Sequence, residues 1–582
     1  MKKWFCYVKP YLLYFILGPL CMIVEVIGEV LMPKMLSLVV TAGTATEAAA
    51  ATLTVGRSIG VACGMIGIAI VMMLGGVGGA YFGAKASVNF AADLRADVYR
   101  KVQKFSFSNI DKFTSGSLLT RLTNDVTQLQ NFVNMILRMA LRSPGMMIGA
   151  LIMAILIKPS LSLVFAVTVP ILFLLVFGMI RVGFSRFSKM QRKIDTLNST
   201  VQESITNVRV VKSFVREAEE KKKFGKANRE LKEHGMNAVK VMICIQPVMT
   251  VLMNLTTLAV LVIGGRNVLI GGMEIGDLSA FLTYVTQILS SLMMISMLLM
   301  HSSRAMASGR RIREVLDEKI DLHDEDAAEK EKRVTRGEVE FKNVSFRYYK
   351  NSEGRVLHAI NLKIKAGSTV GIIGSTGCGK TTLVSMIPRL YDVDEGAVLV
   401  DGVDVRDYSL YNLREGVGMV LQKNVLFSGS IAENLRWGDE SATDEQIKAA
   451  ASSAAAHGFI ESFADGYDTA LGQGGSNVSG GQKQRLCIAR ALLKKPKILI
   501  LDDSTSAVDT ATEAEIRRAF REELCDTTKI IIAQRIGSVR DADQIIVMNE
   551  GCVTGVGTHD ELLTENTEYR EIYESQTDRR GA

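Results

Sequence analysis

The sequence lacks the features that hold secreted proteins together or mark them for cleavage. Its eight cysteines form no Cys-x-x-Cys pair and no spacing typical of a metal site, so we interpret them as free thiols of a reducing compartment. The basic N-terminus leads into an apolar stretch that continues well past the length of a signal peptide, without a small-residue cleavage pattern. This stretch is therefore predicted to remain as a first membrane span.

Positive charge is in excess, with a formal net charge of +7. A nucleic-acid partner would explain such a charge, but the excess gathers in particular connections of the apolar half of the chain. That distribution favours a membrane protein, so we expect a lipid bilayer and no nucleic acid among its partners.

Apolar and charged residues are segregated along the 582-residue chain, which is too long for one ordinary domain. Long apolar runs fill the first half, and a mixed, charge-rich sequence fills the second. This pattern predicts a membrane domain over residues 1–305, a charged linker over 306–336 and a soluble domain over 337–582.

Six stretches of the first domain are apolar and long enough to cross a bilayer, which takes about 20 helical residues. Three short connections carry one Lys or Arg each, whereas 85–131 carries seven and 181–240 carries fifteen. By the positive-inside rule, the two long connections and both chain ends face the cytoplasm. The predicted spans are 11–40, 58–84, 132–157, 161–180, 241–263 and 278–300.

The two long connections are predicted to be helical extensions of the spans. A single helix over 58–104 would be about 70 Å long, whereas the hydrocarbon core takes about 30 Å. The helix must therefore extend far into the cytoplasm, and 186–235 is predicted to do the same.

Five charged side chains fall within the predicted spans, and Lys34 in the first span is one of them. Glu25 and Glu29 lie four residues apart on one helix face, and Arg138 and Arg142 have the same spacing. Charges at membrane depth face a partner charge or a water-filled cavity. The carboxylates are expected either to pair with arginines and fix the packing, or to contact a transported substrate.

The strongest motif of the second domain is GSTGCGKT, residues 374–381, between a strand-like STVGIIG and a helix-like TLVSMI. This context is typical of a P-loop, whose backbone amides cradle phosphates. Lys380 adds a positive charge for the terminal phosphates, and Thr381 offers a hydroxyl to Mg²⁺. The residues predicted to bind ATP here are Gly374, Ser375, Thr376, Gly377, Cys378, Gly379, Lys380, Thr381 and Thr382.

Two further motifs complete the nucleotide-binding pattern. KILILDD, residues 497–503, is an apolar strand that ends in carboxylates, and Asp502 is placed to hold Mg²⁺. NVSGGQKQR, residues 477–485, presents a hydroxyl and close backbone amides at a helix start, where an anion can bind. A glycine helix cap is the structural alternative. The predicted binding residues of this motif are Ser479, Gly480, Gly481 and Gln482.

With these motifs in order, the chain resembles the ATP-binding-cassette (ABC) family, as an exporter-type half-transporter. In that family the 477–485 motif is the signature that contacts nucleotide held by the opposing subunit. The resemblance implies an all-α six-helix transmembrane domain plus an α/β P-loop (RecA-like) nucleotide-binding domain with a helical subdomain. ATP and Mg²⁺ are the cofactors that it implies.

Other positions match the family's landmarks. Tyr348 corresponds to the aromatic residue that stacks on adenine, and Gln422 to the loop glutamine that senses magnesium and the membrane domain. The SAVD sequence at 506–509 resembles the loop that communicates across the dimer. Short coupling helices are expected near 108–114 and 214–221. With Thr381 and Asp502, Gln422 completes the expected set of magnesium ligands.

Two positions depart from the family's pattern. Asp503 stands where a glutamate normally polarises the attacking water, and its carboxylate should fall roughly 1 Å short, which can lower the rate about 100-fold. Gln534 replaces the switch-loop histidine and cannot take its protonation states. We therefore assign Asp503, Gln534 and Gln422 to a slow catalytic site. The chain resembles the degenerate-site subunit of bacterial heterodimeric multidrug exporters, whose partner supplies a catalytic glutamate and histidine. A slow homodimer that uses Asp503 as base is the alternative.

The resemblance implies ATP-driven export of lipophilic or amphipathic small molecules across a bacterial plasma membrane. An exporter-fold importer of metal chelates and a lipid flippase are the alternatives within the fold. The six spans exclude the soluble ABC ATPases that act on DNA or ribosomes. A peptide-processing exporter is disfavoured because about ten residues precede the first span.

Overall fold

The computed structural model describes residues 2–43, 48–324, 327–348, 354–503 and 510–577. Contacts divide the chain into two compact units. The helical unit comprises Met1–Gln103 and Ser115–Asp317, and the sheet unit comprises Lys104–Thr114 and Glu318–Ala582.

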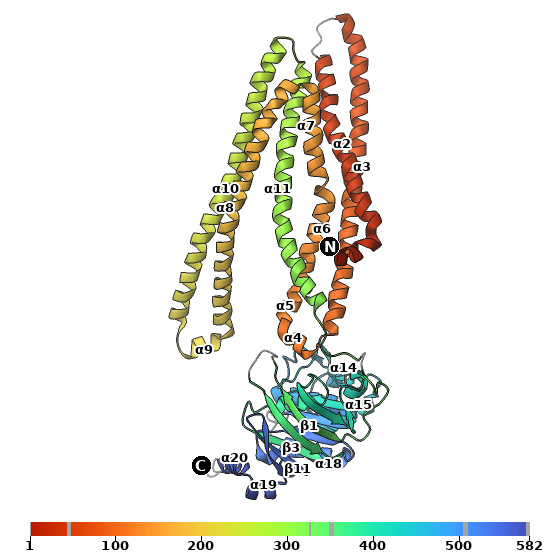
Figure 1. Ribbon diagram of the computed structural model, residues 1–582, viewed down its shortest axis with the longest axis vertical. Coiled ribbons are helices and arrows are strands. Elements are labelled where there is room, and N and C mark those ends of the chain that lie inside the picture. Colours follow the sequence, from red (N-terminus) through yellow and green to blue (C-terminus); the bar gives the residue numbers. More distant parts are fainter. Residues whose placement is uncertain (1, 44–47, 325–326, 349–353, 504–509, 578–582) are drawn as a thin grey trace. The chain divides into compact units, whose positions relative to one another are not determined.

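The helical unit consists of long helices joined by short turns (Figure 1). Each of the six predicted spans lies in one or two of these helices. The elements of the unit are α1 (Lys2–Val8), η1 (Lys9–Tyr11), α2 (Leu12–Gly43), α3 (Ala48–Gln103), α5 (Ser115–Thr120), η2 (Arg121–Asp125), α6 (Val126–Met139), α7 (Arg142–Ile157), α8 (Pro159–Thr206), α9 (Val208–Ser213), α10 (Glu217–Leu269) and α11 (Ile275–Asp317).

Five stretches of the described residues are long and apolar enough to cross a membrane: Trp4–Thr41, Ser58–Gln103, Ser115–Ile157, Glu217–Leu269 and Ile275–Leu298. The predicted span 161–180 lies in α8, where Pro159–Leu175 is a shorter apolar stretch. The extension predicted for 58–104 is present, since α3 continues unbroken to Gln103. α11 likewise continues to Asp317, into the predicted linker.

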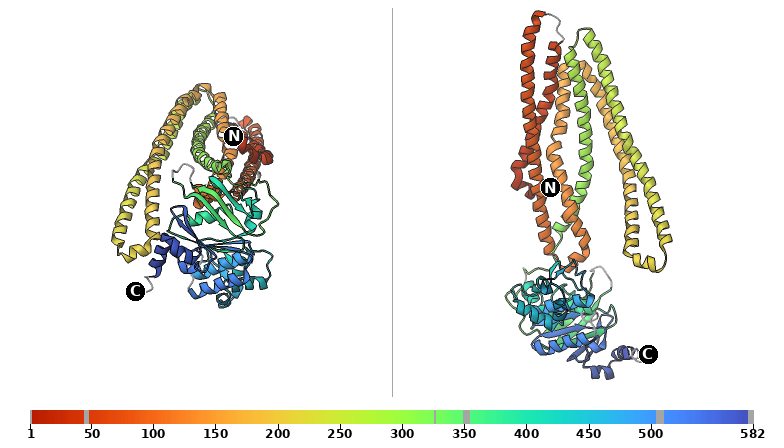
Figure 2. Two further views of the ribbon diagram at one scale, coloured as in Figure 1. Left: turned by 60° about the horizontal axis from the view of Figure 1, so that its bottom comes forward. Right: turned by 180° about the vertical axis from the view of Figure 1, so that it is seen from behind.

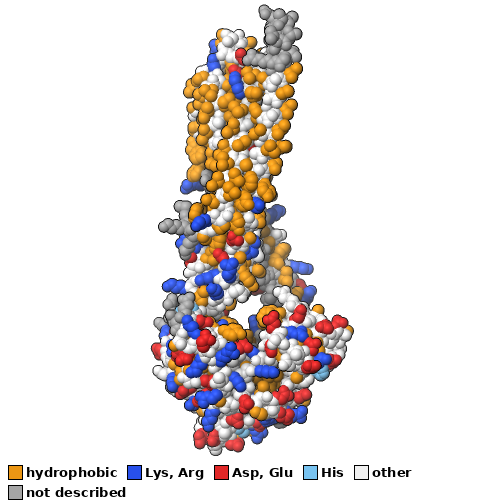
Figure 3. Space-filling view, turned by 90° about the vertical axis from the view of Figure 1, so that its right-hand side faces the viewer, with side chains coloured by type: hydrophobic (Ala, Val, Ile, Leu, Met, Phe, Trp, Pro, Cys, Tyr) orange, Lys and Arg blue, Asp and Glu red, His pale blue; other side chains and the backbone are white. Residues whose placement is uncertain are grey.

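The outer surface of the helical unit is apolar. Leu74, Leu156 and Leu174 are 62%, 72% and 70% exposed, and hydrophobic side chains cover most of this unit's helices in Figure 3. Exposure of an apolar surface of this extent to water is unfavourable, whereas its contact with lipid tails is favourable.

Glycines allow α2 and α3 to pack closely. A Cβ atom at Gly75 would lie 2.9 Å from the carbonyl oxygen of Cys21, and one at Gly79 would lie 2.3 Å from the Met22 side chain. Small residues permit such close approach of the backbones of membrane helices. In lipid the hydrophobic effect does not drive helices together, so close packing has to do so. α8 and α10 form a second pair that lies side by side in Figures 1 and 2.

The apolar core of the helical unit lies among α2, α7, α8 and α11. Phe165 and Phe281 stack with ring centroids 5.4 Å apart. The buried Tyr284 hydroxyl donates to the carbonyl oxygen of Val30 over 2.8 Å, which satisfies the polar atom of an otherwise apolar contact.

The sheet unit contains twelve strands within the described ranges. They form an antiparallel sheet of order β2-β1-β4-β5, a six-stranded sheet of order β12-β11-β3-β10-β9-β6, and the short pair β7-β8. The strands are β1 (Val339–Phe346), β2 (Leu357–Ile364), β3 (Thr369–Gly374), β4 (Glu395–Val400), β5 (Val403–Asp404), β6 (Val417–Val420), β7 (Gly429–Ser430), β8 (Ala470–Leu471), β9 (Ile498–Asp502), β10 (Thr528–Ile532), β11 (Gln544–Asn549) and β12 (Cys552–Gly557).

Five neighbouring strands of the six-stranded sheet, β11-β3-β10-β9-β6, are parallel. β9 and β10 are buried along their whole length, which explains the apolar runs 498–501 and 530–532 within them. The helices of the unit are α4 (Phe107–Phe113), α12 (Lys380–Ser385), α13 (Leu410–Glu415), α14 (Ile431–Arg436), α15 (Asp444–Ser453), α16 (His457–Glu461), η3 (Gly466–Asp468), α17 (Gly480–Leu493), α18 (Thr510–Glu523), η4 (Ile536–Ser538), α19 (His559–Glu565) and α20 (Thr567–Thr577).

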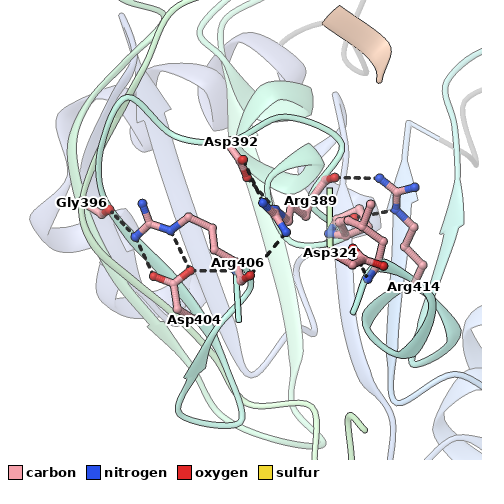
Figure 4. Close-up of polar contacts among 9 residues, drawn as sticks. Asp324, Arg389, Asp392, Gly396, Asp404, Arg406 and Arg414 are labelled. Atoms are coloured by element: carbon pink, nitrogen blue, oxygen red, sulfur yellow. Dashed lines mark hydrogen bonds and ion pairs between the residues drawn. The ribbon is translucent and has the colours of Figure 1, made fainter. Parts of the chain in front are cut away.

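An arginine network fixes the segment that follows α12 (Figure 4). The Arg389 guanidinium donates to both Asp392 carboxylate oxygens, and Arg414 donates to the carbonyl oxygen of Arg389 over 2.8 Å. Asp324, just after the end of α11, accepts from the Leu410 amide. The network holds the loop that carries Tyr391, whose contacts are described below.

Candidate functional site

The parallel sheet brings four chain segments to one edge. β3, β10, β9 and β6 are neighbours that run in the same direction, so their carboxyl ends meet there. These ends lead into the P-loop, Gln534, the pair Asp502 and Asp503, and Gln422. In parallel α/β sheets, ligands bind at this edge.

The P-loop owes its shape to glycine. Gly374, Gly377 and Gly379 have φ values of +154°, +86° and +95°, which other residues rarely adopt. A Cβ atom at Gly374 would also lie 2.0 Å from the carbonyl oxygen of Met548. Lys380 Nζ donates to the carbonyl oxygens of Gly374 (2.8 Å) and Ser375 (2.7 Å), which holds the ammonium group against the loop.

Thr381 and Asp502 suit a magnesium ion. The Thr381 hydroxyl donates to Asp502 Oδ1 over 3.0 Å. Asp502 is 2% exposed, and its Oδ2 atom has no hydrogen-bond partner among the described residues. Burial raises the pKa of this carboxyl group. A divalent cation would be bound by the Asp502 Oδ2 atom and would favour the ionised carboxylate, so Thr381 and Asp502 fit Mg²⁺.

The two positions that depart from the family's pattern contact each other. Gln534 Nε2 donates to Asp503 Oδ2 over 2.7 Å. Burial raises the pKa of the Asp503 carboxyl group, and hydrogen bonds from Gln534 and Gln422 only partly offset this. Gln422, expected as a magnesium ligand, is therefore turned toward Asp503. The three residues assigned to the slow catalytic site form one hydrogen-bonded group.

Two glutamines that sequence reasoning missed support this group. Gln484 is 1% exposed and donates to the carbonyl oxygen of Asp503 over 3.3 Å. Gln576 of α20 donates to the carbonyl oxygen of Gln534 over 2.9 Å. Gln484 lies in the signature motif, whereas nothing in the local sequence around Gln576 indicates this contact.

Tyr348 lies beside the P-loop helix. Its hydroxyl is 2.8 Å from Thr382 Oγ1, and its ring meets that of Tyr391 edge-to-face at 5.3 Å. The side chain is 41% exposed, so a ring face remains available for a flat, apolar ligand such as adenine.

The signature residues lie on a different element. Ser479 caps α17, whose fourteen residues begin at Gly480, and Gln482 completes a capping box with it. Their hydrogen bonds lie within the start of α17, and among the described residues none joins Ser479, Gly480, Gly481 or Gln482 to the P-loop. The predicted dimer-communication loop at 506–509 lies outside the described residues.

The first expected coupling helix is α4, which packs within the sheet unit. The Tyr391 hydroxyl donates to Asp111 Oδ2 over 2.9 Å, and the Phe107 ring lies 6.0 Å from that of Tyr391. Because Tyr391 also contacts Tyr348, one aromatic ring links α4 to the expected adenine site. Tyr391 was not identified from the sequence.

The second coupling helix was predicted near 214–221, and this position was wrong. The short helix is α9, which ends at Ser213, and residues from Glu217 onward belong to the long helix α10. Between them Val215 adopts a φ of +54°, and Phe214 and Val215 are 71% and 79% exposed. The sharp backbone turn at 214–216 separates the two helices.

In the helical unit, one arginine joins both acidic residues of α2. Arg142 Nη2 lies 2.7 Å from Glu29 Oε1 and 3.1 Å from Glu25 Oε1. The expected pairing of carboxylates with arginine is thus present for Arg142, and Arg138 takes no part in it.

Two cavities lie next to this ion cluster. The first has a volume of about 480 Å³ and the second about 320 Å³. The first is lined by Met22, Glu25, Ala69, Met72, Met73, Gly76, Val77, Arg138 and Arg142. The second is lined by Asn131, Asn134, Met135, Arg138, Met139 and Arg142.

Comparison with known proteins agrees with the division of the chain into two units. Residues 15–292 match the family model "ABC transporter transmembrane region", and residues 357–506 match the model "ABC transporter". A solved structure of a bacterial Atm1-family ABC exporter with ATP bound is 26% identical to this chain and has a TM-score of 0.75. The match covers 95% of this chain and 98% of that structure.

Three curated relatives illustrate the range of the family. An uncharacterized ABC transporter ATP-binding protein of Bacillus subtilis (strain 168), YfiB, is 38% identical over the whole of both chains. A fatty acid ABC transporter ATP-binding/permease protein of Mycobacterium bovis is 36% identical over 82% of this chain and 75% of its own. An ATP-dependent lipid A-core flippase of Syntrophus aciditrophicus is 33% identical over 83% of this chain and 80% of its own.

The chain belongs to the ABC transporter family, as a half-transporter with one transmembrane and one nucleotide-binding domain. The predicted fold class is confirmed, and the chain is a multi-pass membrane protein of exporter type.

Proposed function

We propose that the chain is the weak-site subunit of a heterodimeric exporter that moves lipophilic or amphipathic molecules with energy from ATP. The observation that carries this proposal is the Asp503–Gln534 hydrogen bond beside an otherwise complete nucleotide-binding edge. The site retains the groups that bind ATP and Mg²⁺, while the groups that activate water are replaced.

The binding half of the proposed mechanism uses three groups of this chain. Lys380 and the P-loop amides hold the phosphates, and Tyr348 offers its ring to adenine. Thr381 and Asp502 would hold Mg²⁺, which neutralises phosphate charge during transfer. These contacts depend on strand ends and glycine geometry, so nothing in Asp503 or Gln534 weakens them.

The catalytic half is impaired for two reasons. Asp503 is one methylene shorter than glutamate, and a shortfall of roughly 1 Å can lower the rate about 100-fold. Its Oδ2 atom also accepts a hydrogen bond from Gln534, so this oxygen is already engaged where it would otherwise accept from the attacking water. Gln534 itself has no titration near neutral pH.

A second chain would complete the site. The start of α17 presents backbone amides at a helix N-terminus, where the macrodipole favours a phosphate, and within the described ranges the P-loop of this chain makes no hydrogen bond to it. We therefore propose that the signature of this chain completes the partner's site. That partner carries the catalytic glutamate and switch-loop histidine.

The relatives support an amphipathic cargo. One carries fatty acid and another is a lipid A-core flippase, by name, and the cavities of the helical unit are rich in methionine. Flexible methionine side chains adapt to varied apolar shapes. Movement of lipid between leaflets is the second candidate function, favoured by the flippase relative. We place the protein in a bacterial plasma membrane with both termini in the cytoplasm.

Coupling would run through α4. Tyr391 joins this helix to Tyr348, and α4 continues in the chain to α3 and α5 of the helical unit. Closure of two nucleotide-binding domains around ATP would move α4 and shift the helices between inward and outward access.

Copurification tests the assembly. The tagged chain is isolated in mild detergent from its native membranes, and the ratio of accompanying polypeptides is measured. The proposal predicts a second, different half-transporter in about 1:1 ratio, with an Asp-Glu pair and a switch-loop histidine. Recovery of this chain alone as a dimer would overturn the heterodimer and make Asp503 the working base.

A further inference from the structure

The cavities of the helical unit meet at a cation without a counter-ion. Arg138 of α6 lines both the 480 Å³ and the 320 Å³ cavity. Among the residues that the structure describes, it makes no hydrogen bond and no ion pair. The first cavity is within the range of about 300–1,000 Å³ that is typical of small-molecule sites.

Among the described residues, no ion pair joins Arg138 to the carboxylates near it. Glu25 and Glu29 both direct one carboxylate oxygen at Arg142, one helical turn beyond Arg138. Their other oxygens are buried without a partner among the described residues. Glu25 lines the first cavity together with Arg138, but among the described residues both carboxylates pair with Arg142 and not with Arg138.

Space is left for the Arg138 side chain and for a ligand. Gly83 of α3 faces it, and a Cβ atom there would lie 3.4 Å from Arg138 Cγ and 3.2 Å from Asn134 Oδ1. Asn131 and Asn134 line the second cavity beside Arg138 and bring amide donors. The remaining walls carry the flexible apolar side chains Met22, Met72, Met73, Met135 and Met139.

We propose that Arg138 binds the anionic head of an amphipathic ligand, a carboxylate, sulfate or phosphate, whose apolar body lies against the methionines. A guanidinium at membrane depth is costly without a counter-ion, and an anion from the ligand supplies one. This inference rests on the proposed function and specifies the class of molecule transported.

Probe binding without nucleotide tests the proposal directly. The full complex as purified is titrated in detergent with dansyl-undecanoate and with its uncharged amide, and fluorescence gives the two dissociation constants. We expect the carboxylate to bind about 10-fold more tightly than the amide, the effect of one charge-assisted hydrogen-bonded contact. In Arg138→Gln the two probes bind equally, and Arg138→Lys retains most of the preference.

Controls separate the charge from the fold. Arg266→Gln removes an exposed arginine at the far end of α10 and should keep the native preference. If Arg138→Gln fails to fold, the comparison of carboxylate and amide in the native protein still tests the proposal, and Arg138→Lys shows whether a cation of another shape suffices. Equal binding of carboxylate and amide by the native protein, or an unchanged preference in Arg138→Gln, would overturn the inference.

A second arm identifies the source of the anion. The native complex is placed in nanodiscs of phosphatidylcholine alone or with added phosphatidylglycerol. Loss of carboxylate binding in the second discs assigns the anion to a lipid head group, and unchanged binding assigns it to a soluble amphiphile; both support the site. Since no ATP is present, failure here is distinct from failure of the proposed function, which copurification measures.

Discussion

The functional side chains of the sheet unit lie at the ends of strands, whereas those of the helical unit lie where helices pack against one another. At the strand ends, the backbone fixes the positions of the P-loop, Asp502 and Asp503, which belong to short sequence motifs. In the helices, Arg142 meets Glu25 and Glu29 across more than a hundred positions of sequence. The groups at the strand ends suit a cofactor that the whole family shares. The identity of the polar residues between packed helices can differ from one transporter to another with the molecule transported.

The largest expected effect comes from breaking the ion cluster in the helical unit. Arg142→Gln leaves two carboxylates without their cation, which should destabilise the protein by about 3–5 kcal/mol, the usual effect of removing one partner of a buried ion pair. Thermal unfolding of the purified protein measures the change. The triple variant Glu25→Gln, Glu29→Gln, Arg142→Gln should recover much of the loss, and failure to recover would contradict the account of the cluster.

Introducing the family's glutamate and histidine tests whether Asp503 and Gln534 limit hydrolysis in the sheet unit. The double variant Asp503→Glu, Gln534→His should raise ATP hydrolysis at this site about 100-fold, because the longer carboxylate reaches the water and histidine replaces the amide. Hydrolysis is measured with the partner's catalytic glutamate changed to glutamine, so that only this site contributes. An unchanged rate would show that the two residues do not limit the site.

Removing the P-loop cation tests binding apart from catalysis. Lys380→Ala should weaken ATP binding to this chain about 10- to 30-fold, the loss of a charge-assisted contact to phosphate. Photolabelling with an azido-ATP measures the affinity. Lys448→Ala on the exposed face of α15 serves as the control and should bind ATP normally. Equal binding by both variants would remove Lys380 from the site.

A smaller effect concerns stability against pH. Burial raises the pKa of Asp502, so the folded state holds its proton more tightly than the unfolded state. The stability that the protonated group contributes is lost as pH rises through the folded pKa. At pH 7, Asp502→Asn should therefore raise the melting temperature of the nucleotide-free protein and abolish the further rise caused by Mg²⁺ with ATP. A lower melting temperature would contradict this.

The same contrast explains what could be predicted from the sequence. The P-loop and the apolar spans follow from local patterns, namely glycine spacing and apolar length, and five of the six predicted spans lie in stretches long enough to cross a membrane among the described residues. The contacts Gln484–Asp503, Gln576–Gln534 and Tyr391–Asp111 join segments that are far apart in sequence, so no local pattern indicates them. The second coupling helix was misplaced because its boundary depends on a turn at Val215, a β-branched residue that local rules do not place at positive φ.

The account depends most on the claim that this chain binds ATP but hydrolyses it slowly. The complex is incubated with Mg²⁺ and α-labelled azido-ATP, irradiated, and the nucleotide attached to each subunit is identified. The account predicts ATP on this chain and ADP on its partner after many turnovers. ADP on this chain in the same proportion as on the partner would contradict it.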